Sequence, residues 1–143
     1  MSVPVRWLQP FAALLAAQGF GTWQATGAYP GNAVWPIFLE AVPSKPGRLI
    51  TVTGYGGISP PHDLEPRVQL RIRGDTDPRT SRGKAEDVFD YLHYLTGGVQ
   101  LPGGPWLVCA PSVNGEVAPL GGPDENGRFT HITNHALTVS REP

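Results

Sequence analysis

The chain has one cysteine, few charged side chains and no long apolar run, and each shortage excludes a class of protein. Cys109 alone rules out an internal disulfide and any metal site built from several cysteines. Charged residues are only 16% of the 143 residues and the formal net charge is −1, so no overall basic field favours nucleic acid. No apolar run reaches membrane-spanning length, so we expect no membrane partner.

Glycine and proline, in contrast, are abundant. The chain holds 18 Gly and 16 Pro, and no low-complexity tract accounts for them. Their number therefore indicates many short elements and long loops. The length suits one domain with one modest core over residues 1–143. The apolar start resembles a signal peptide, but Gln9 and Pro10 interrupt it and Arg6 is the only basic residue before it. We therefore expect the retained N-terminal helix of a cytosolic protein.

A first helix is predicted over residues 5–18, where large apolar side chains recur three or four positions apart. Gly19 is a natural residue to follow its last turn. Proline is tolerated in a helix only near its first turn, so Pro10 indicates that the helix proper begins close to Gln9.

A second helix is predicted between Asp77 and Gly97. Asp77 suits the N-cap and Pro78 suits the first helical position. An apolar stripe follows, made of Ala85, Val88, Phe89, Leu92 and Leu95. Gly83 lies inside this helix at a cost of about 1 kcal/mol relative to alanine, so we expect another backbone to approach it closely.

Alternation and turn residues predict the strands. The clearest is residues 67–73, where Val68, Leu70 and Ile72 alternate with Arg67, Gln69, Arg71 and Arg73. Further strands are expected at 33–42, 48–54, 99–101 paired with 105–110 as a hairpin, and 128–141. Pro36 predicts an edge position or a bulge in the first of these, and a bulge near Thr133 would reconcile the imperfect alternation of the last.

Long loops are expected at 57–66, stiffened by three prolines, and at 111–127, ending in an Asn-Gly turn with positive φ. The element order is helix, three strands, helix, three strands. We therefore predict an α+β fold: a largely antiparallel or mixed β-sheet with two helices packed on one face.

The four histidines do not form a metal-binding pattern. His131 and His135 lie four apart on a predicted strand, which places them on one face about 13 Å apart, too far for one ion to bridge. His93 lies on the second predicted helix and His62 in the proline-rich loop, without an HxH or HExxH motif. We therefore expect no metal and no other cofactor.

Other short motifs are better explained by structure than by chemistry. In the tripeptide RGD, residues 73–75, the glycine ends a strand and the aspartate begins the turn to the helix. Cys109 lies in an apolar stretch and is expected to be a small buried residue. Ser81 and Ser112 lack the GxSxG context of a nucleophile. We therefore expect no enzymatic activity.

Arg67, Arg71 and Arg73 share one face of the clearest strand and are the remaining functional signal. They suit contact with phosphates, the lining of a pore, or pairing with acids on a neighbouring subunit. A solvated sheet face explains them equally well, and three arginines without interleaved aromatic residues make a weak nucleic-acid footprint. Helices that cover one sheet face leave the other open, so subunit packing would use this open face.

The segments RVQLRIRG, DPRTSR, DYLHYL and GPDENGRFTHITNHALTV occur in that order along the chain. Their order and spacing resemble the minor capsid or tail terminator family of long-tailed, siphovirus-type bacteriophages. The resemblance extends from the first helix to Val139. The sequence departs from the family pattern at Pro10 and in the loop 57–66.

The resemblance implies a virion structural protein without catalytic residues. Such subunits form a hexameric ring at the head-proximal end of the tail tube, end tube polymerisation and form the head–tail joining interface. The implied partners are other copies of the chain, the tail tube protein, a head–tail connector or stopper protein, and DNA that crosses the lumen without sequence-specific binding. The implied location is the head–tail junction of the virion, after assembly in the host cytoplasm.

We expect the loops 57–66 and 111–127 to contact neighbouring subunits, the tube or the neck. The candidate contact residues are Arg67, Arg71, Arg73, His62, Asp63, Glu116, Asp124 and Glu125. Three alternatives stay open. They are another neck protein, such as a head-completion or stopper subunit; a small metal-dependent enzyme that uses His131 or His135; and a nucleic-acid module, whose binding would fall steeply with salt.

Overall fold

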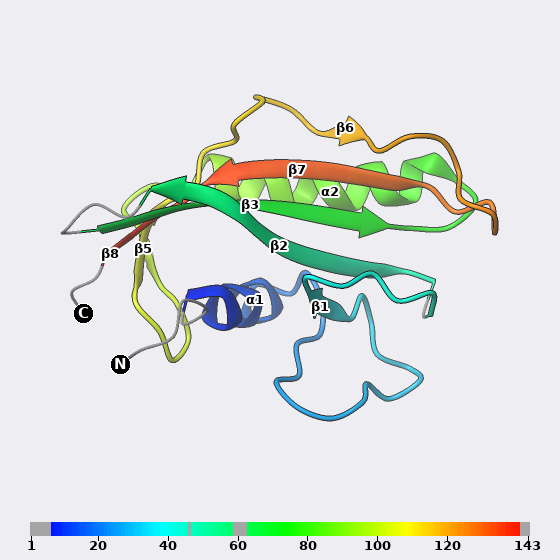
Figure 1. The fold of residues 1–143 in the computed structure, drawn as a ribbon, viewed down its shortest axis with the longest axis horizontal. Helices are drawn as coiled ribbons and strands as arrows, with labels where there is room; N and C mark the ends of the chain where they lie inside the picture. The colour runs from blue at the N-terminus through cyan, green and yellow to red at the C-terminus, as the bar shows by residue number, and fades with distance from the viewer. Residues whose placement is uncertain (1–6, 46, 59–62, 141–143) are drawn as a thin grey trace.

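A computed structural model describes residues 7–45, 47–58 and 63–140, and within them the chain forms two helices and eight strands (Figure 1). The helices are α1 (Leu8–Ala17) and α2 (Pro78–His93). The strands are β1 (Ile37–Leu39), β2 (Leu49–Ile58), β3 (Asp63–Arg73), β4 (Val99–Gln100), β5 (Trp106–Cys109), β6 (Ala118–Pro119), β7 (Thr130–Ala136) and β8 (Thr138–Ser140). The predicted α+β class is confirmed.

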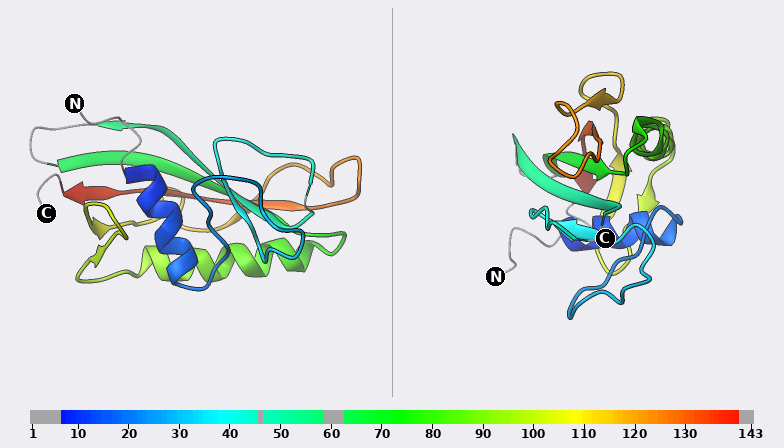
Figure 2. Two further views of the ribbon diagram at one scale, coloured as in Figure 1. Left: turned by 90° about the horizontal axis from the view of Figure 1, so that it is seen from below. Right: turned by 90° about the vertical axis from the view of Figure 1, so that its right-hand side faces the viewer.

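The strands form one curled, mixed sheet. Its order is β1-β2-β3-β8-β5-β4, and β7 also pairs with β3 and carries β6 on its other edge. Only the β1–β2 pair is parallel; the other described pairs are antiparallel. Both helices lie on the same side of the sheet, with α1 crossing the strands and α2 running alongside them (Figure 2). This arrangement is the predicted one.

The centre of the sheet is β3, and its alternation is as predicted. Val68, Leu70 and Ile72 have no exposed surface and point to the helices. In the register of the sheet, Leu70 lies between Val52 of β2 and Thr133 of β7. Because successive side chains of a strand point to opposite faces, the arginines of β3 lie on the face turned away from both helices.

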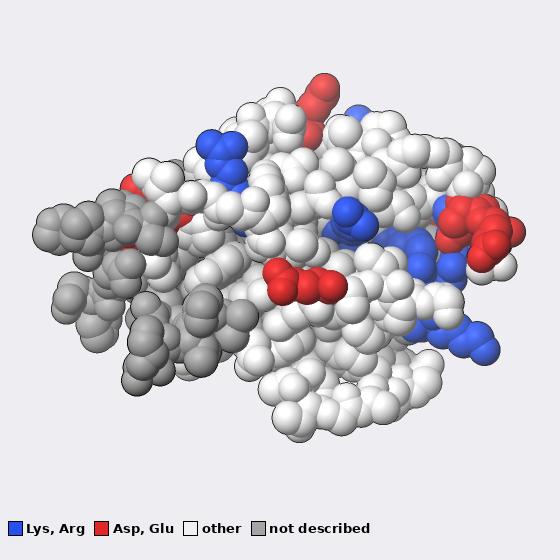
Figure 3. Space-filling view, viewed as in Figure 1, with Lys and Arg blue, Asp and Glu red and all other residues white. Residues whose placement is uncertain are grey.

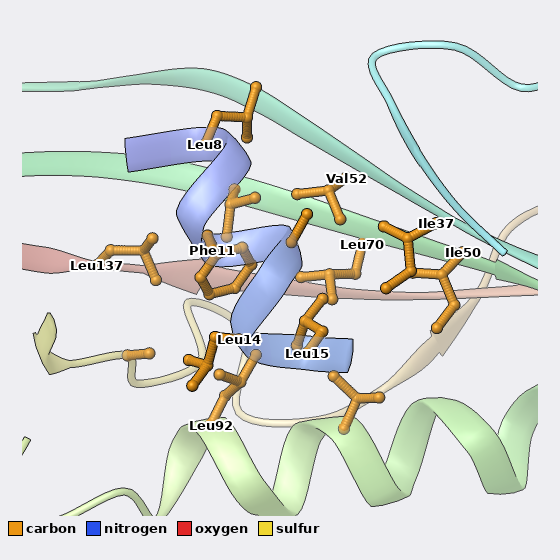
Figure 4. Close-up of a cluster of buried hydrophobic side chains, with 14 of the residues drawn as sticks. Leu8, Phe11, Leu14, Leu15, Ile37, Ile50, Val52, Leu70, Leu92 and Leu137 are labelled. Carbon is orange, nitrogen blue, oxygen red and sulfur yellow. The ribbon is translucent and has the colours of Figure 1, made fainter. Parts of the chain in front are cut away.

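The core lies between this sheet face and the two helices (Figure 4). From α1 it takes Phe11, Leu14 and Leu15, which are at most 2% exposed. Leu92 of α2 packs in the same cluster. Pro10 falls in the first turn of α1, as the sequence predicts, and Gly19 follows the helix with φ of 84°. Neither described helix is long and apolar enough to cross a membrane.

The start of α2 has the predicted cap, but two expectations for this helix were wrong. The Asp77 side chain accepts a hydrogen bond from the backbone N–H of Arg79 at 3.0 Å, with proline at the first helical position. The helix ends at His93, one turn earlier than expected. A Cβ atom placed on Gly83 would have no neighbour within 4 Å, so no other backbone approaches this glycine.

The loop predicted at 57–66 is largely a β-hairpin. β2 continues to Ile58 and β3 begins at Asp63, with Ile58 paired opposite Glu65. The sequence did not show this because the extension passes through a bulge between Gly54 and Gly57, where Gly56 and Gly57 have positive φ. His62 lies outside the described residues. The loop predicted at 111–127 is likewise interrupted by β6.

The bulge expected near Thr133 is absent from the last two strands. Thr133 sits in regular register opposite Leu70, so β7 has no bulge there. The inward side chains are those with odd numbers, namely His131, Thr133, His135, Leu137 and Val139, all at most 5% exposed. Ile132 has an even number and points to the other face, so the inner face of β7 itself is polar. The ladder breaks instead at Leu137, whose N–H donates to the Pro66 carbonyl at 2.8 Å.

The two remaining strand predictions were confirmed in outline. β4 and β5 form the expected hairpin. β1 is the expected edge strand, but it is only three residues long, because Trp35 and Glu40 on either side have positive φ of 47° and 59°. Cys109, expected to be buried, is half-buried at the end of β5.

Candidate functional site

The arginine face of β3 carries the main candidate residues. Arg67 is exposed, Arg71 is half-buried and Arg73 is 6% exposed. Arg71 donates through Nε to the Gln69 side chain at 2.8 Å. Figure 3 shows separate positive side chains in this view, with acidic ones near the centre and at the right edge, so the face is a polar surface with separate cations instead of a basic patch.

Arg73 stabilises a segment of its own chain. Its Nε donates to the Gly47 carbonyl at 2.9 Å, and Nη2 donates to the carbonyls of Pro43 and Ser44 at 2.8 and 3.3 Å. Burial is the main reason that the pKa of Arg73 is lowered, and the nearby Arg128 lowers it further. Arg128 also donates to the Ser44 carbonyl, at 2.8 Å. Two guanidinium groups therefore hold the backbone at Pro43, Ser44 and Gly47 over one end of the arginine face.

The rest of this face is an amide network. Gln69 of β3 donates to the Asn134 side chain of β7 at 3.2 Å, and Asn134 donates to Asn114 at 3.3 Å. Gln69 lies between Arg67 and Arg71 along β3 and opposite Asn134 in the register of the sheet. A surface of amides and widely spaced arginines suits hydrogen bonding to a protein better than neutralisation of many phosphates.

The acidic candidates do not form one cluster, although Asp124 and Glu125 are adjacent. Asp124 accepts from the backbone N–H groups of Asn126 and Arg128, both at 2.9 Å, and pairs with the Arg128 side chain. The bond from the Arg128 N–H is the main reason that the pKa of Asp124 is lowered. Glu125 beside it and Glu116 are exposed. Asp63 belongs to the hairpin at the other end of β3, where it pairs with Ser140.

The described histidines are structural. His131 shares a hydrogen bond with Ser81 at 2.7 Å through Nδ1, and His135 bonds the Ala110 carbonyl and the Thr133 hydroxyl at 2.7 and 2.8 Å. Ser81 has no exposed surface and His131 only 5%, so a substrate cannot reach this Ser–His pair. In the part of the chain that is described, no three His, Cys, Asp or Glu side chains group so as to hold a metal ion.

The RGD tripeptide is part of the turn before α2. Arg73 is held by backbone carbonyls, and Asp75 pairs with Arg48 at 2.7 Å. The Arg48 hydrogen bond is the main reason that the pKa of Asp75 falls to about 2. Gly74 packs against Ser81: a Cβ atom there would lie 2.8 Å from the Ser81 backbone nitrogen. The tripeptide is therefore not displayed as an adhesion loop.

A surface that the sequence reasoning missed is the uncharged lobe, residues 20–39. Residues 7–39 contain no Asp, Glu, Lys, Arg or His, which is the signal that identifies it. The lobe lies at the lower edge of the view in Figure 3, where the surface shows no charged side chain. The lobe, with β1 at its end, forms a groove of about 840 Å³ together with Lys45 and Gly47. Its aromatic lining comes from Trp23, Tyr29 and Phe38.

Internal hydrogen bonds hold the lobe in shape. The Tyr29 hydroxyl donates to the Ile37 carbonyl of β1 and accepts from the Gln24 N–H. The Gln24 side chain donates to the carbonyls of Thr26 and Ala28 at 3.0 and 2.9 Å. The Tyr29 ring meets that of Phe38 edge to face at 5.2 Å. The groove is therefore formed before any partner arrives.

Two cations anchor the base of the lobe to the body. The Lys84 ammonium of α2 lies 5.8 Å from the Phe20 ring and 5.2 Å from the Trp35 ring, and Arg48 lies 5.8 Å from the same Trp35 ring. Burial lowers the pKa of Lys84. Such contacts contribute about 0.5–1 kcal/mol each at exposed sites and more when desolvated.

A family model described as bacteriophage tail terminator protein matches residues 14–141. The chain belongs to this family. No curated protein matches the chain. Membership makes it a tail component of a bacteriophage, a structural and non-enzymatic protein that interacts with the tail tube. The resemblance stated from the sequence is thereby confirmed.

The candidate contacts of this tail terminator fall into three separate places on its surface. The arginine face of β3 carries Arg67 and Arg71, the β2–β3 hairpin carries Asp63, and the segment before β7 carries Asp124 and Glu125. The structure does not bring them together into one site. Several distinct surfaces are what a subunit with several protein neighbours requires.

Proposed function

We propose that this tail terminator forms a hexameric ring at the head-proximal end of the tail tube. The ring ends tube polymerisation and presents the surface on which the filled head docks through a connector or stopper protein. The family match over residues 14–141 is the observation that carries the proposal. The subunit is added in the host cytoplasm and stays at the head–tail junction of the virion.

The separation of surfaces on the subunit supports a ring. In a closed ring each subunit contacts its two neighbours with two different surfaces, and the contact repeats until it closes. The hairpin of β2 and β3 and the uncharged lobe lie toward different ends of the molecule (Figure 1). The arginine face lies between them, free of both helices.

Within this proposal, Arg67 and Arg71 face a neighbouring subunit or the lumen. Arg73 acts indirectly, since it holds residues 43–47 of its own chain. Asp63 and the adjoining His62 contact a neighbour, and Glu116, Asp124 and Glu125 contact the tube or the neck. A lumen with few cations suits DNA that must pass without being retained, because each neutralised phosphate adds affinity.

Electron microscopy of particles from a phage whose copy of this gene is disrupted tests the proposal. We expect overlong, headless tails, and normal tails again when the wild-type gene is supplied from a plasmid. Tails of normal length beside unattached heads would make the protein a head-completion or stopper subunit instead. Intact infectious particles would contradict both assignments.

A further inference from the structure

We propose that the groove of the uncharged lobe receives the β2–β3 hairpin of a second copy of the chain. The inference rests on the proposed ring and specifies its subunit contact. The donor surface is the hairpin arm, defined as residues 54–58 and 63–66. The receiving surface is the groove that the lobe, with β1, forms together with Lys45 and Gly47.

The groove has the composition of the centre of a protein interface. Aromatic side chains are enriched and charges are depleted in such centres. Trp23, Tyr29 and Phe38 line the groove, and Lys45 is its one charged lining residue. Because hydrogen bonds already fix the lobe, a partner binds there without the entropic cost of ordering it.

The hairpin arm offers apolar side chains and an open strand edge. Tyr55 is 47% exposed and Ile58 is 64% exposed. β1 ends at Leu39, opposite Val52, so among the described strands none pairs with the outer edge of residues 55–58. Exposed apolar side chains on an unpaired edge favour association with another chain.

The charges of the two surfaces are complementary. Residues 54–66 contain Asp63 and Glu65 but no lysine or arginine. Among the described residues that line the groove none is acidic, and Lys45 is basic. Opposite charges at the edge of an apolar contact speed association and fix its register more than they add affinity.

The arm that enters the groove comes from another copy, since the arm and the groove of one subunit lie apart and cannot meet (Figure 1). A contact between two different surfaces is heterologous, so it propagates from copy to copy, and it forms a ring where the rotation between neighbours closes. An isologous pair would instead bring the same surface of both copies together.

Engineered cysteines test this contact. In a Cys109→Ser background, Ala28→Cys in the groove and Ile58→Cys on the arm are placed at exposed positions, so the fold is retained. Tails are purified from a gene-disrupted phage complemented with the double variant and are oxidised mildly. We expect a ladder of covalently linked copies on a non-reducing gel. Ala28→Cys combined with Asp90→Cys, an exposed position on α2, is the matched control and should give no ladder.

Each outcome separates the contact from the proposed function. Tails of normal length that contain the double variant but give no ladder would overturn the contact and leave the terminator role intact. Cross-linking of the groove cysteine to the tube protein would also overturn it, because the occupant would then be the tube. Normal, infectious particles after gene disruption alone would overturn the function itself.

A charge exchange gives a second test that does not depend on oxidation. Lys45→Glu alone, or Asp63→Lys with Glu65→Lys alone, should lower incorporation into tails about tenfold, since like charges then meet. All three substitutions together should restore incorporation to within about twofold of wild type. A triple variant no better than the worse of its parents would contradict the contact, even if the cysteine variants fail to assemble.

Discussion

The Oγ atom of Ser81 and the Nδ1 atom of His131 lie 2.7 Å apart across the interface between α2 and β7. Beyond His131 on the inner face of β7 follow Thr133 and His135, which have no exposed surface. Buried polar groups are stable only when they are hydrogen-bonded, so this row fixes how α2 lies on the sheet. If β7 shifted its register by one residue, these polar side chains would turn to the outer face and those of the outer face would turn inward.

Ser81→Ala removes this hydrogen bond and leaves a buried histidine nitrogen without its partner. We expect the free energy of unfolding to fall by about 1–3 kcal/mol, the usual cost of a buried group that loses its bond. Urea denaturation followed by tryptophan fluorescence measures the change. Asp90→Asn, exposed on the same helix, should stay within about 0.5 kcal/mol of wild type. Equal stability of Ser81→Ala and wild type would show that the bond contributes nothing net.

Stability should fall as the pH falls from about 6.5 to about 4. Burial is the main reason that the pKa of His135 lies at about 4 instead of the ordinary 6.5, and His93 nearby lowers it further. Between these values the unfolded chain binds a proton that the folded chain does not, so the free energy of unfolding decreases by on the order of 3 kcal/mol in total. Above pH 6.5 this group makes no difference, since it is neutral in both states.

Urea midpoints at about pH 7.5 and about pH 5 measure this dependence. Burial also lowers the pKa of His131, so its contribution has the same sign. His135→Gln should be less stable than wild type at neutral pH, because the packing and the hydrogen bonds of the buried imidazole ring are lost. Its midpoint should nevertheless change less between the two pH values. An unchanged pH dependence in this variant would assign the effect to other groups.

The elements with strong local signals were predictable from the sequence. The alternation in β3 and the Asp77–Pro78 start of α2 are local patterns, and both elements formed where expected. The hairpin arm and β6 were not predictable, because their pairing depends on glycine bulges and on strands distant in the sequence. The inner face of β7 was misjudged for a related reason: its polar side chains have partners distant in the sequence, Ser81 of α2 for His131 and the Ala110 carbonyl for His135.

The candidate surfaces were predictable only in part. The arginine face follows from alternation, but the backbone carbonyls that hold Arg73 come from residues 43–47, which no sequence pattern connects to it. The uncharged lobe had a plain signal, the absence of charge between Arg6 and Glu40. The absence of charge does not predict the groove, because the groove depends on the hydrogen bonds that Tyr29 makes with Gln24 and Ile37.

Arg73→Ala should destabilise the protein by about 2 kcal/mol, because the carbonyls of residues 43–47 lose a charged donor. The effect should be local as well: limited proteolysis should report faster cleavage near Ser44, and hydrogen exchange faster exchange at Ser44 and Gly47. Arg67→Ala, on the same face of the same strand but exposed, is the matched control and should change stability by less than about 0.5 kcal/mol. Equal losses of stability in the two variants would mean that the hydrogen bonds from Arg73 to these carbonyls do not stabilise the protein.

Two glycines around the start of α2 should respond to alanine with opposite signs. A Cβ atom on Gly74 would lie 2.8 Å from the Ser81 backbone nitrogen, so Gly74→Ala forces the strand and the helix apart and should cost about 1–3 kcal/mol. A Cβ atom on Gly83 meets nothing within 4 Å, and alanine is the better helix former, so Gly83→Ala should raise stability by about 0.5–1 kcal/mol. Thermal and urea unfolding of both variants measure the difference. A loss of stability in Gly83→Ala would contradict the open space beside this glycine.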